Sequence, residues 1–257
     1  MAIEIIGTPQ VGVANNGGNC TLTWDVRPST GDYTVVVNGS PATLNAIGTM
    51  STADYNLLAS HQGANNANPS LAIYWKKQGA TTDTTAIGAS ANGADTDSTL
   101  IGFVLRGVDA DTFSDATPTT AGETASTNPD PASITVGTSG ACVIVAACMT
   151  VVMDSSIVAP SGYTGYSQIG SDTDDHTLAA AYKLNCSGTE APASWTTWST
   201  GLWYAITIAI RPAAAPTISA KVMVDGVWKT VSSAMVMVSG VWKAVSSIKT
   251  MVSGAWK

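Results

Sequence analysis

The last 36 residues of the chain, 222–257, repeat one unit at a period of 14 residues. A glycine and a tryptophan anchor each copy, at Gly226 and Trp228, at Gly240 and Trp242, and at Gly254 and Trp256. A fixed period marks a repeated structural unit, and it outweighs the preferences of single residues when a fold is predicted. The repeat therefore limits the end of the chain to copies of one small structure.

Each copy of the unit predicts a β-hairpin. A short apolar run precedes Asp-Gly at 225–226 and Ser-Gly at 239–240 and 253–254, and a β-branched and aromatic run follows. Asp-Gly between such runs is a strong signal for a two-residue turn, because glycine takes positive φ without steric cost; Ser-Gly is weaker. With the Ser-Ser pairs at 232–233 and 246–247 as return turns, the segment predicts a small antiparallel meander.

A meander of this size is too thin to bury a core of its own. Two-stranded hairpins are marginally stable in water, and repeated units need stacked neighbours. We therefore expect the repeats to pack on the rest of the chain, on copies of themselves or on a partner.

The two parts of the chain carry opposite charge. Residues 1–211 hold six basic and seventeen acidic residues, a net charge of −11, whereas residues 212–257 hold five lysines and one aspartate, a net charge of +4. Such asymmetry indicates an interaction surface. Alternatively, one lysine per hairpin prevents edge-to-edge pairing of strands. The acidic body argues against nucleic acid as a partner, since a basic stripe would be expected there.

The cysteine pattern favours buried free thiols. Cys142 and Cys148 are evenly spaced within one apolar run, so on a strand they share a side, about 20 Å apart at roughly 3.3 Å per residue, too far to bridge. A bridge between Cys20 and Cys186 stays open as an alternative. No Cys-x-x-Cys spacing occurs and only two histidines are present, so we expect no zinc site and no other metal or cofactor.

The N-terminal residues contain no basic segment followed by a long apolar stretch, and the longest apolar runs have the length of strands. We therefore expect no secretory signal, no membrane insertion, and synthesis in a cytoplasm without export by the classical route.

Short apolar runs separated by Gly, Pro and Asn predict a body that is nearly all β. The predicted strands include 20–26, 33–37, 71–76, 100–106, 134–136, 141–152, 178–184, 193–198 and 203–211. Residues 107–131 show no periodicity and are expected to form a loop, and His61 is expected in a polar loop.

A second, weaker repeat lies within the body. Its halves match at offsets of about 105–108 residues, pairing 31–37 with 139–145, 71–76 with 178–183, and 100–106 with 204–211. We expect a jelly-roll-like two-sheet sandwich of two related halves, with each half lending strands to both sheets. The expected domains are a body at 1–211, a Pro/Ala hinge at 212–220 and the repeat tail at 221–257.

Several short motifs give the body a resemblance to known proteins. They are Pro-x-Gly-Tyr at 160–163, Ala-x-x-Tyr-Lys at 179–183 with Gly-Thr-Glu at 188–190, Trp-Thr-x-x-Ser within 195–200, and a last strand that ends in Ile210-Arg211. With these motifs the body resembles a jelly-roll-like β-sandwich domain of many phage and prophage-borne proteins. The Gly-Val-Trp-Lys repeats are similar to short C-terminal repeats of phage tail and fibre proteins. The resemblance implies no catalytic residues.

The sequence gives little support to catalysis. His61 and His176 are the only imidazoles, and no Gly-x-Ser-x-Gly nucleophile elbow exists. A glycosidase would need two acids in one cleft, and the three glutamates are Glu4, Glu123 and Glu190. The Asp-rich stretches at 109–111 and 172–175 lack the full spacing of a calcium loop. We expect a protein that is not an enzyme.

Tryptophans and lysines are the candidate interaction residues. In the tail they are Trp228, Trp242 and Trp256, each followed by a lysine at 229, 243 and 257. Their equivalent positions indicate one face that binds a sugar or packs on the sandwich or a symmetry mate. Trp195 and Trp198 are further glycan candidates, although their odd spacing places them on opposite sides of a strand.

Together with the resemblance, these features predict a non-enzymatic structural component of a bacteriophage particle, located in the virion. A tail-tip or tail-fibre protein with host-surface adhesion is the first expectation, and a capsid decoration protein and a carbohydrate-binding module are the alternatives. The expected partners are other virion proteins, further copies of the chain in a trimer by family analogy, and a host glycan.

Overall fold

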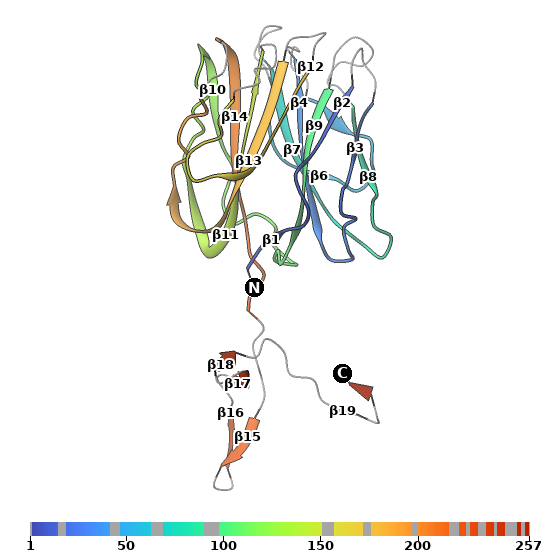
Figure 1. Cartoon of the computed structure of the whole chain (residues 1–257), viewed down its shortest axis with the longest axis vertical. Helices are drawn as coiled ribbons and strands as arrows, with labels where there is room; N and C mark the ends of the chain where they lie inside the picture. Colours follow the sequence, from blue (N-terminus) through green and yellow to red (C-terminus); the bar gives the residue numbers. More distant parts are fainter. Residues whose placement is uncertain are drawn as a thin grey trace. The chain divides into compact units, whose positions relative to one another are not determined.

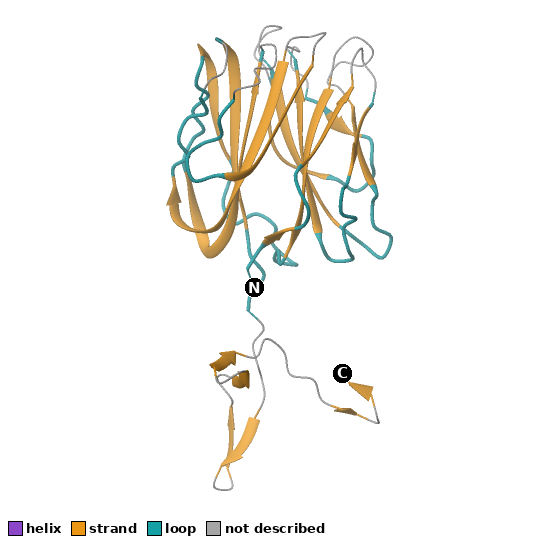
Figure 2. Ribbon diagram, viewed as in Figure 1, coloured by secondary structure: helices purple, strands orange, loops and turns teal. Residues whose placement is uncertain are grey.

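The computed structural model describes most of the body and the strands of the tail. The described residues are 2–14, 19–41, 47–62, 69–89, 98–150, 157–171, 176–196 and 200–215, and, in the tail, 221–224, 227–230, 235–238, 241–244, 251–252 and 255–256. They form strands and loops (Figure 2), and none of them forms a helix long and apolar enough to cross a membrane. The predicted all-β fold is confirmed.

The first large sheet is built from residues 4–106. Its antiparallel strands lie in the order β1-β9-β4-β7-β6, and β2 also pairs with β9. The strands are β1 (Glu4–Ile5), β2 (Gln10–Ala14), β4 (Tyr33–Ser40), β6 (Asn56–His61), β7 (Ser70–Lys77) and β9 (Ser98–Arg106).

The second large sheet is built from residues 119–210. Its antiparallel order is β10-β14-β11-β13-β12. The strands are β10 (Thr119–Ser126), β11 (Ile134–Met149), β12 (Thr164–Ser171), β13 (His176–Glu190) and β14 (Gly201–Ile210). Figure 1 shows this sheet facing the first one, so that the two form a sandwich.

Each half of the body therefore makes one whole sheet. In chain order, β1, β4, β6, β7 and β9 take the same places in the first sheet as β10, β11, β12, β13 and β14 take in the second. The expectation that each half lends strands to both sheets is wrong. Strands of a jelly roll alternate between its two sheets, and the described strands do not show that interleaving.

A small third sheet covers the outer side of the first. It has the order β3-β8-β5, from β3 (Cys20–Thr23), β8 (Thr85–Ala89) and β5 (Thr49–Met50). Leu22 and Trp24 pack with Val36 and Leu100 in the core between this sheet and the first large sheet.

The central strands are buried on both faces. Alternate residues of β4 show this, because Val35 and Val37 face the core between the large sheets while Val36 faces the outer core. On β11, Ile144 faces the core between the large sheets and Val145 faces the outer core of the second sheet. Burial on both sides explains why these strands appear in the sequence as continuous apolar runs.

Loops cover the outer side of the second sheet. Ile157, Tyr163 and Trp195 pack there against Val143 and Val145. The main-chain N–H of Trp195 donates to the carbonyl of Pro129 over 2.8 Å, which fastens one covering loop to another. The predicted strand at 193–198 is therefore wrong: its described part is an extended segment held by one bridge, between Val158 and Thr196.

Two arginines fasten the ends of equivalent strands. Arg106, the last residue of β9, donates from Nε and Nη2 to the two carboxylate oxygens of Asp32, each over 2.9 Å. Arg211, next after β14, donates from Nε to Oδ1 of Asp115 over 3.2 Å. Pro212 and Ala213, which the sequence places in the hinge, bridge to the loop after β9 at Val108 and Gly107.

Asp115 is a buried acid held in its ionised form. Its Oδ2 accepts the main-chain N–H groups of Gly137 and Thr138 over 2.7 and 2.8 Å, and its side chain is 0% exposed. Burial alone would raise the pKa of this carboxyl, but the hydrogen bonds from Thr138, Gly137 and Arg211 outweigh burial and lower the pKa of Asp115 below its ordinary value.

We predict that Asp115→Asn lowers the free energy of unfolding at pH 7 by about 1–3 kcal/mol, because buried donors lose a charged acceptor. A lowered carboxyl pKa adds stability above the unfolded pKa of about 3.9 and loses it as pH falls through the folded pKa. The difference in the free energy of unfolding between parent and variant, measured by urea unfolding, should therefore shrink from pH 6 to pH 3. Asp111→Asn, at an exposed aspartate, is the control and should show no such difference.

Candidate functional site

The described strands of the tail form three separate two-stranded sheets. They are β15 (Lys221–Val224) with β16 (Val227–Thr230), β17 (Met235–Val238) with β18 (Val241–Ala244), and β19 (Met251–Val252) with β20 (Ala255–Trp256). Each pair is antiparallel, which confirms the hairpins that Asp-Gly and Ser-Gly predict. The continuous meander is wrong, because the described strands of one hairpin do not pair with those of another.

The three hairpins share one register. Trp228 lies opposite Met223, Trp242 opposite Met237, and Trp256 opposite Met251. The next pair in the first two hairpins joins a valine to a lysine, as Val222 to Lys229 and Val236 to Lys243. The Met–Trp pair and the Val–Lys pair therefore occupy successive positions of the ribbon in these two hairpins. Lys257 lies outside the described residues.

The tail and the body are separate compact units, residues 214–257 and residues 2–213. A two-stranded ribbon has no second layer, so it is marginally stable in water without a covering surface. The Met–Trp pair is the constant feature of the three hairpins.

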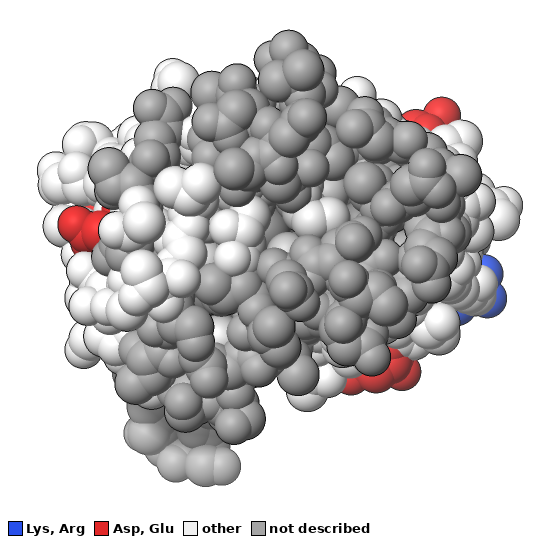
Figure 3. Space-filling model, turned by 90° about the horizontal axis from the view of Figure 1, so that it is seen from above, with Lys and Arg blue, Asp and Glu red and all other residues white. Residues whose placement is uncertain are grey.

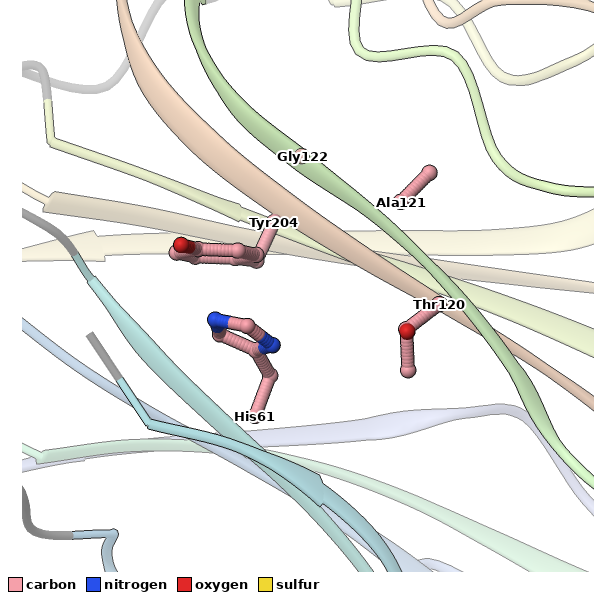
Figure 4. A pocket seen from close by; sticks show the side chains of 5 residues that line it. All are labelled: His61, Thr120, Ala121, Gly122 and Tyr204. Carbon is pink, nitrogen blue, oxygen red and sulfur yellow. The ribbon is translucent and has the colours of Figure 1, made fainter. Parts of the chain in front are cut away.

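The body contributes a different candidate, a pocket at one edge of the sandwich (Figure 4). It has a volume of about 240 Å³, and its lining residues are His61, Thr120, Ala121, Gly122 and Tyr204. His61 ends β6, the edge strand of the first large sheet, while Tyr204 lies on β14 next to the edge strand β10 of the second. Residues of both large sheets therefore line the pocket.

Small residues on β10 create the pocket. Thr120 and Gly122 pair with Ile206 and Tyr204, so they share the face that the second sheet turns toward the first. Gly122 has a φ of 152°, and a Cβ there would meet the carbonyl oxygen of Trp203 and, at 2.5 Å, Cδ1 of Tyr204. Only glycine lets the β10 backbone lie this close to the tyrosine ring. An irregularity between Gly122 and Ala125 also bends the edge.

The wall of the pocket is a stack of two rings. The imidazole of His61 is stacked on the phenol ring of Tyr204, with ring centroids 3.4 Å apart and an interplanar angle of 24°. Tyr204 is 1% exposed and His61 is half-buried. Tyr204 is therefore buried beneath the stack. Of the lining residues, His61 is partly exposed to solvent and Thr120 is exposed.

The sequence does not predict this pocket. The stretch from Thr119 to Ser126 falls inside the loop expected at 107–131, yet it forms the edge strand β10. His61, expected in a polar loop, is the last residue of a strand. Neither stretch alternates between polar and apolar residues. The internal repeat is the one signal in the sequence for β10: it relates β9 to β14, and since β1 pairs with β9, a corresponding strand beside β14 would be expected.

Trp195 is not a glycan platform. Its side chain is 0% exposed and belongs to the core under the covering loops, so no face of its ring can stack on a sugar. Trp198 lies outside the described residues. The odd spacing of these two tryptophans agrees with burial of one of them.

The four cysteines are free and buried, so the Cys20–Cys186 bridge is wrong and the reading as buried thiols is confirmed. Cys142 and Cys148 both face the core between the large sheets, as their spacing predicts. Burial raises the pKa of Cys20 and of Cys148 to about 12 and that of Cys186 to about 11, and it also raises the pKa of Cys142.

The remaining polar candidates have structural roles. His176 is fully buried and its Nε2 lies 3.0 Å from the hydroxyl of Thr99. Asp109 accepts the main-chain N–H groups of Asp111 and Thr112 within its own turn. Across the described part of the chain, no three His, Cys, Asp or Glu side chains are grouped so as to hold a metal ion.

Internal ion pairs occupy most of the body's cations. Lys76 pairs with Asp83 over 2.9 Å and Lys183 with Glu190 over 2.6 Å, in addition to the two arginine pairs. Four of the six basic residues of the body are therefore neutralised within it. On the face seen in Figure 3 the described charged side chains lie at the rim.

Comparison of the chain with protein-family models, with curated proteins and with solved structures gives no match.

We predict that none of the four thiols reacts with Ellman's reagent (DTNB) in the native protein at pH 8. The thiolate is the reacting form, and burial both raises the pKa values and blocks access. The free-thiol count should rise to four on unfolding in guanidinium chloride. A thiol that reacts within minutes in the native state would contradict the described packing.

Proposed function

We propose that the chain is a non-enzymatic structural component of a bacteriophage particle, in which the sandwich is the displayed body and the hairpin tail makes the assembly contacts. The observation that carries the proposal is the repeated Met–Trp register of three hairpins in a unit separate from the body. The resemblance of the Gly-Val-Trp-Lys repeats to those of phage tail and fibre proteins supports a place at the tail tip or in a tail fibre.

Repetition gives such a tail its strength. Each of the first two hairpins has one Met–Trp pair and one Val–Lys pair, so a single hairpin is a small contact surface. Contacts of several linked hairpins add in avidity, because the second binding event is intramolecular. Weak single contacts therefore suffice for stable attachment when many copies meet a repeated surface.

Charge selects the surface that the tail meets. The tail has a net charge of +4, and the body keeps a large acidic surplus after its internal ion pairs are counted. An acidic neighbour, either another copy of the chain or another virion protein, attracts the lysines at 229, 243 and 257. We propose a homo-oligomer held by tail contacts between copies.

The test is sedimentation velocity of the full chain with Trp228, Trp242 and Trp256 all changed to alanine. We predict an oligomer for the parent and a monomer for the variant, because the constant apolar pair of each hairpin is lost. The Tm of the body should not change. The control removes three exposed apolar residues of the body by Val11→Ala, Val13→Ala and Val26→Ala, and should leave the oligomer intact.

A second variant separates charge from packing. Changing Lys229, Lys243 and Lys257 to glutamine should weaken the oligomer less than the tryptophan changes do, and should remove most of its dependence on salt. An oligomer that survives the loss of all three tryptophans, or a parent that is monomeric at every concentration, would overturn the proposal.

A further inference from the structure

We propose that β2, an edge strand of the first large sheet, pairs with one strand of a tail hairpin from a neighbouring copy of the chain. The inference rests on the proposed function, in which the tail makes the contacts between copies, and it names the surface that the tail meets. The contact is β-augmentation, in which an added strand extends a sheet through main-chain hydrogen bonds. The main chain of Gln10–Ala14 provides the surface.

The outer edge of β2 is a row of main-chain groups that have no partner. β2 pairs with β9 on one side (Figure 1), from Gln10 opposite Gly102 to Ala14 opposite Ser98. Among the residues that the structure describes, the main chain of 10–14 makes no hydrogen bond other than those of this ladder. Alternate N–H and C=O groups of an edge strand point away from its sheet, so this row can pair with another strand.

The other edge strands of the two large sheets carry features that hinder such pairing. β6, β10 and β12 each contain a shift in register within the strand. β1 has only two residues, and one of them is the charged Glu4. Irregular pairing, charge and shortness are common means by which proteins keep the edge of a sheet from pairing with another chain.

β2 has none of these features. Its register against β9 is unbroken, and its sequence Gln-Val-Gly-Val-Ala contains no charged residue and no proline. Val11 lies opposite Ile101, whose side chain is in the core between the large sheets, so Val11 and Val13 point toward the second sheet. They are nevertheless 40% and 43% exposed, so β12, the strand of the second sheet near β2, leaves this edge accessible.

The small third sheet covers a face of β2 and leaves its edge open. A Cβ on Gly12 would lie 2.6 Å from the carbonyl oxygen of Thr21, so the main chain of β3 packs closely on β2 at this glycine. A Cβ points out of the plane of a sheet, whereas the pairing groups of an edge strand lie in that plane. The contact with β3 therefore leaves the outward N–H and C=O groups of β2 unobstructed.

A tail strand suits this place in its pairing, length and charge. Each hairpin is a two-stranded sheet that pairs with no other described strand, and a third strand would stabilise such a marginal ribbon. The strands of the first two hairpins have four residues, against five in β2. The tail has a net charge of +4 and the body one of −11, so tail and body attract whereas two bodies repel.

The test is hydrogen exchange of the full chain, measured at single residues in the parent oligomer and in the triple tryptophan variant. We expect the outward amides of residues 10–14 to exchange more than about tenfold slower in the oligomer, because they gain hydrogen-bond partners. The amides of residues 56–61 in β6 are the internal control and should exchange equally in both proteins. Equal exchange of the β2 amides in oligomer and monomer would overturn the inference.

A charge on the edge gives a second measurement. Val13→Lys should raise the Kd of the oligomer at least about tenfold, because a lysine on an edge opposes strand pairing and repels the lysines of the tail. Leu57→Lys is the matched control on β6, where the leucine is 49% exposed, and it should leave the oligomer intact. Val13→Ala keeps the main chain free to pair and should leave the oligomer intact as well. Equal weakening by the two lysine changes would contradict the inference.

These measurements separate the inference from the proposed function. An oligomer that depends on the tail tryptophans, but is insensitive to Val13→Lys and leaves the β2 amides unprotected, overturns the inference alone. A parent that is monomeric at every concentration overturns both.

Discussion

Burial of both faces of the central strands is the constraint on which the rest of the body depends. Between them, β4, β9, β11 and β14 place alternate residues in the core between the large sheets and in two outer cores. Each buried CH₂ contributes about 0.8 kcal/mol, so these strands dominate the stability. The small third sheet and the loops around Trp195 follow from the need to cover the outer faces.

The strands with continuous apolar runs could be predicted from the sequence, whereas their partners could not. The predicted strands at 71–76 and 100–106 stand out in the sequence because residues 71–74 and 100–105 are buried at every position. The pairing of strands depends on which covering layer packs on each face, and the residues of those layers are distant in the sequence. The internal repeat does show two related halves, but it does not show that each half closes on itself as one sheet.

The candidate sites divide in the same way. The tail hairpins follow from the local sequence signals at Asp-Gly and Ser-Gly, so the pairing of their strands was predictable. The pocket depends on an edge strand of small and polar residues, from Thr119 to Ser126, which has no alternating pattern of its own. Trp195 shows the opposite case, in which a residue type suited to sugar binding serves the core.

The central claim is that the body is carried on a phage particle and attached through the tail. Immunogold labelling of purified particles with an antibody against the body tests it most directly, because it needs no knowledge of the partner. The account predicts gold at the tail tip or along the tail fibres. Particles that carry no gold at any position, although the antibody recognises the free protein, would contradict the account.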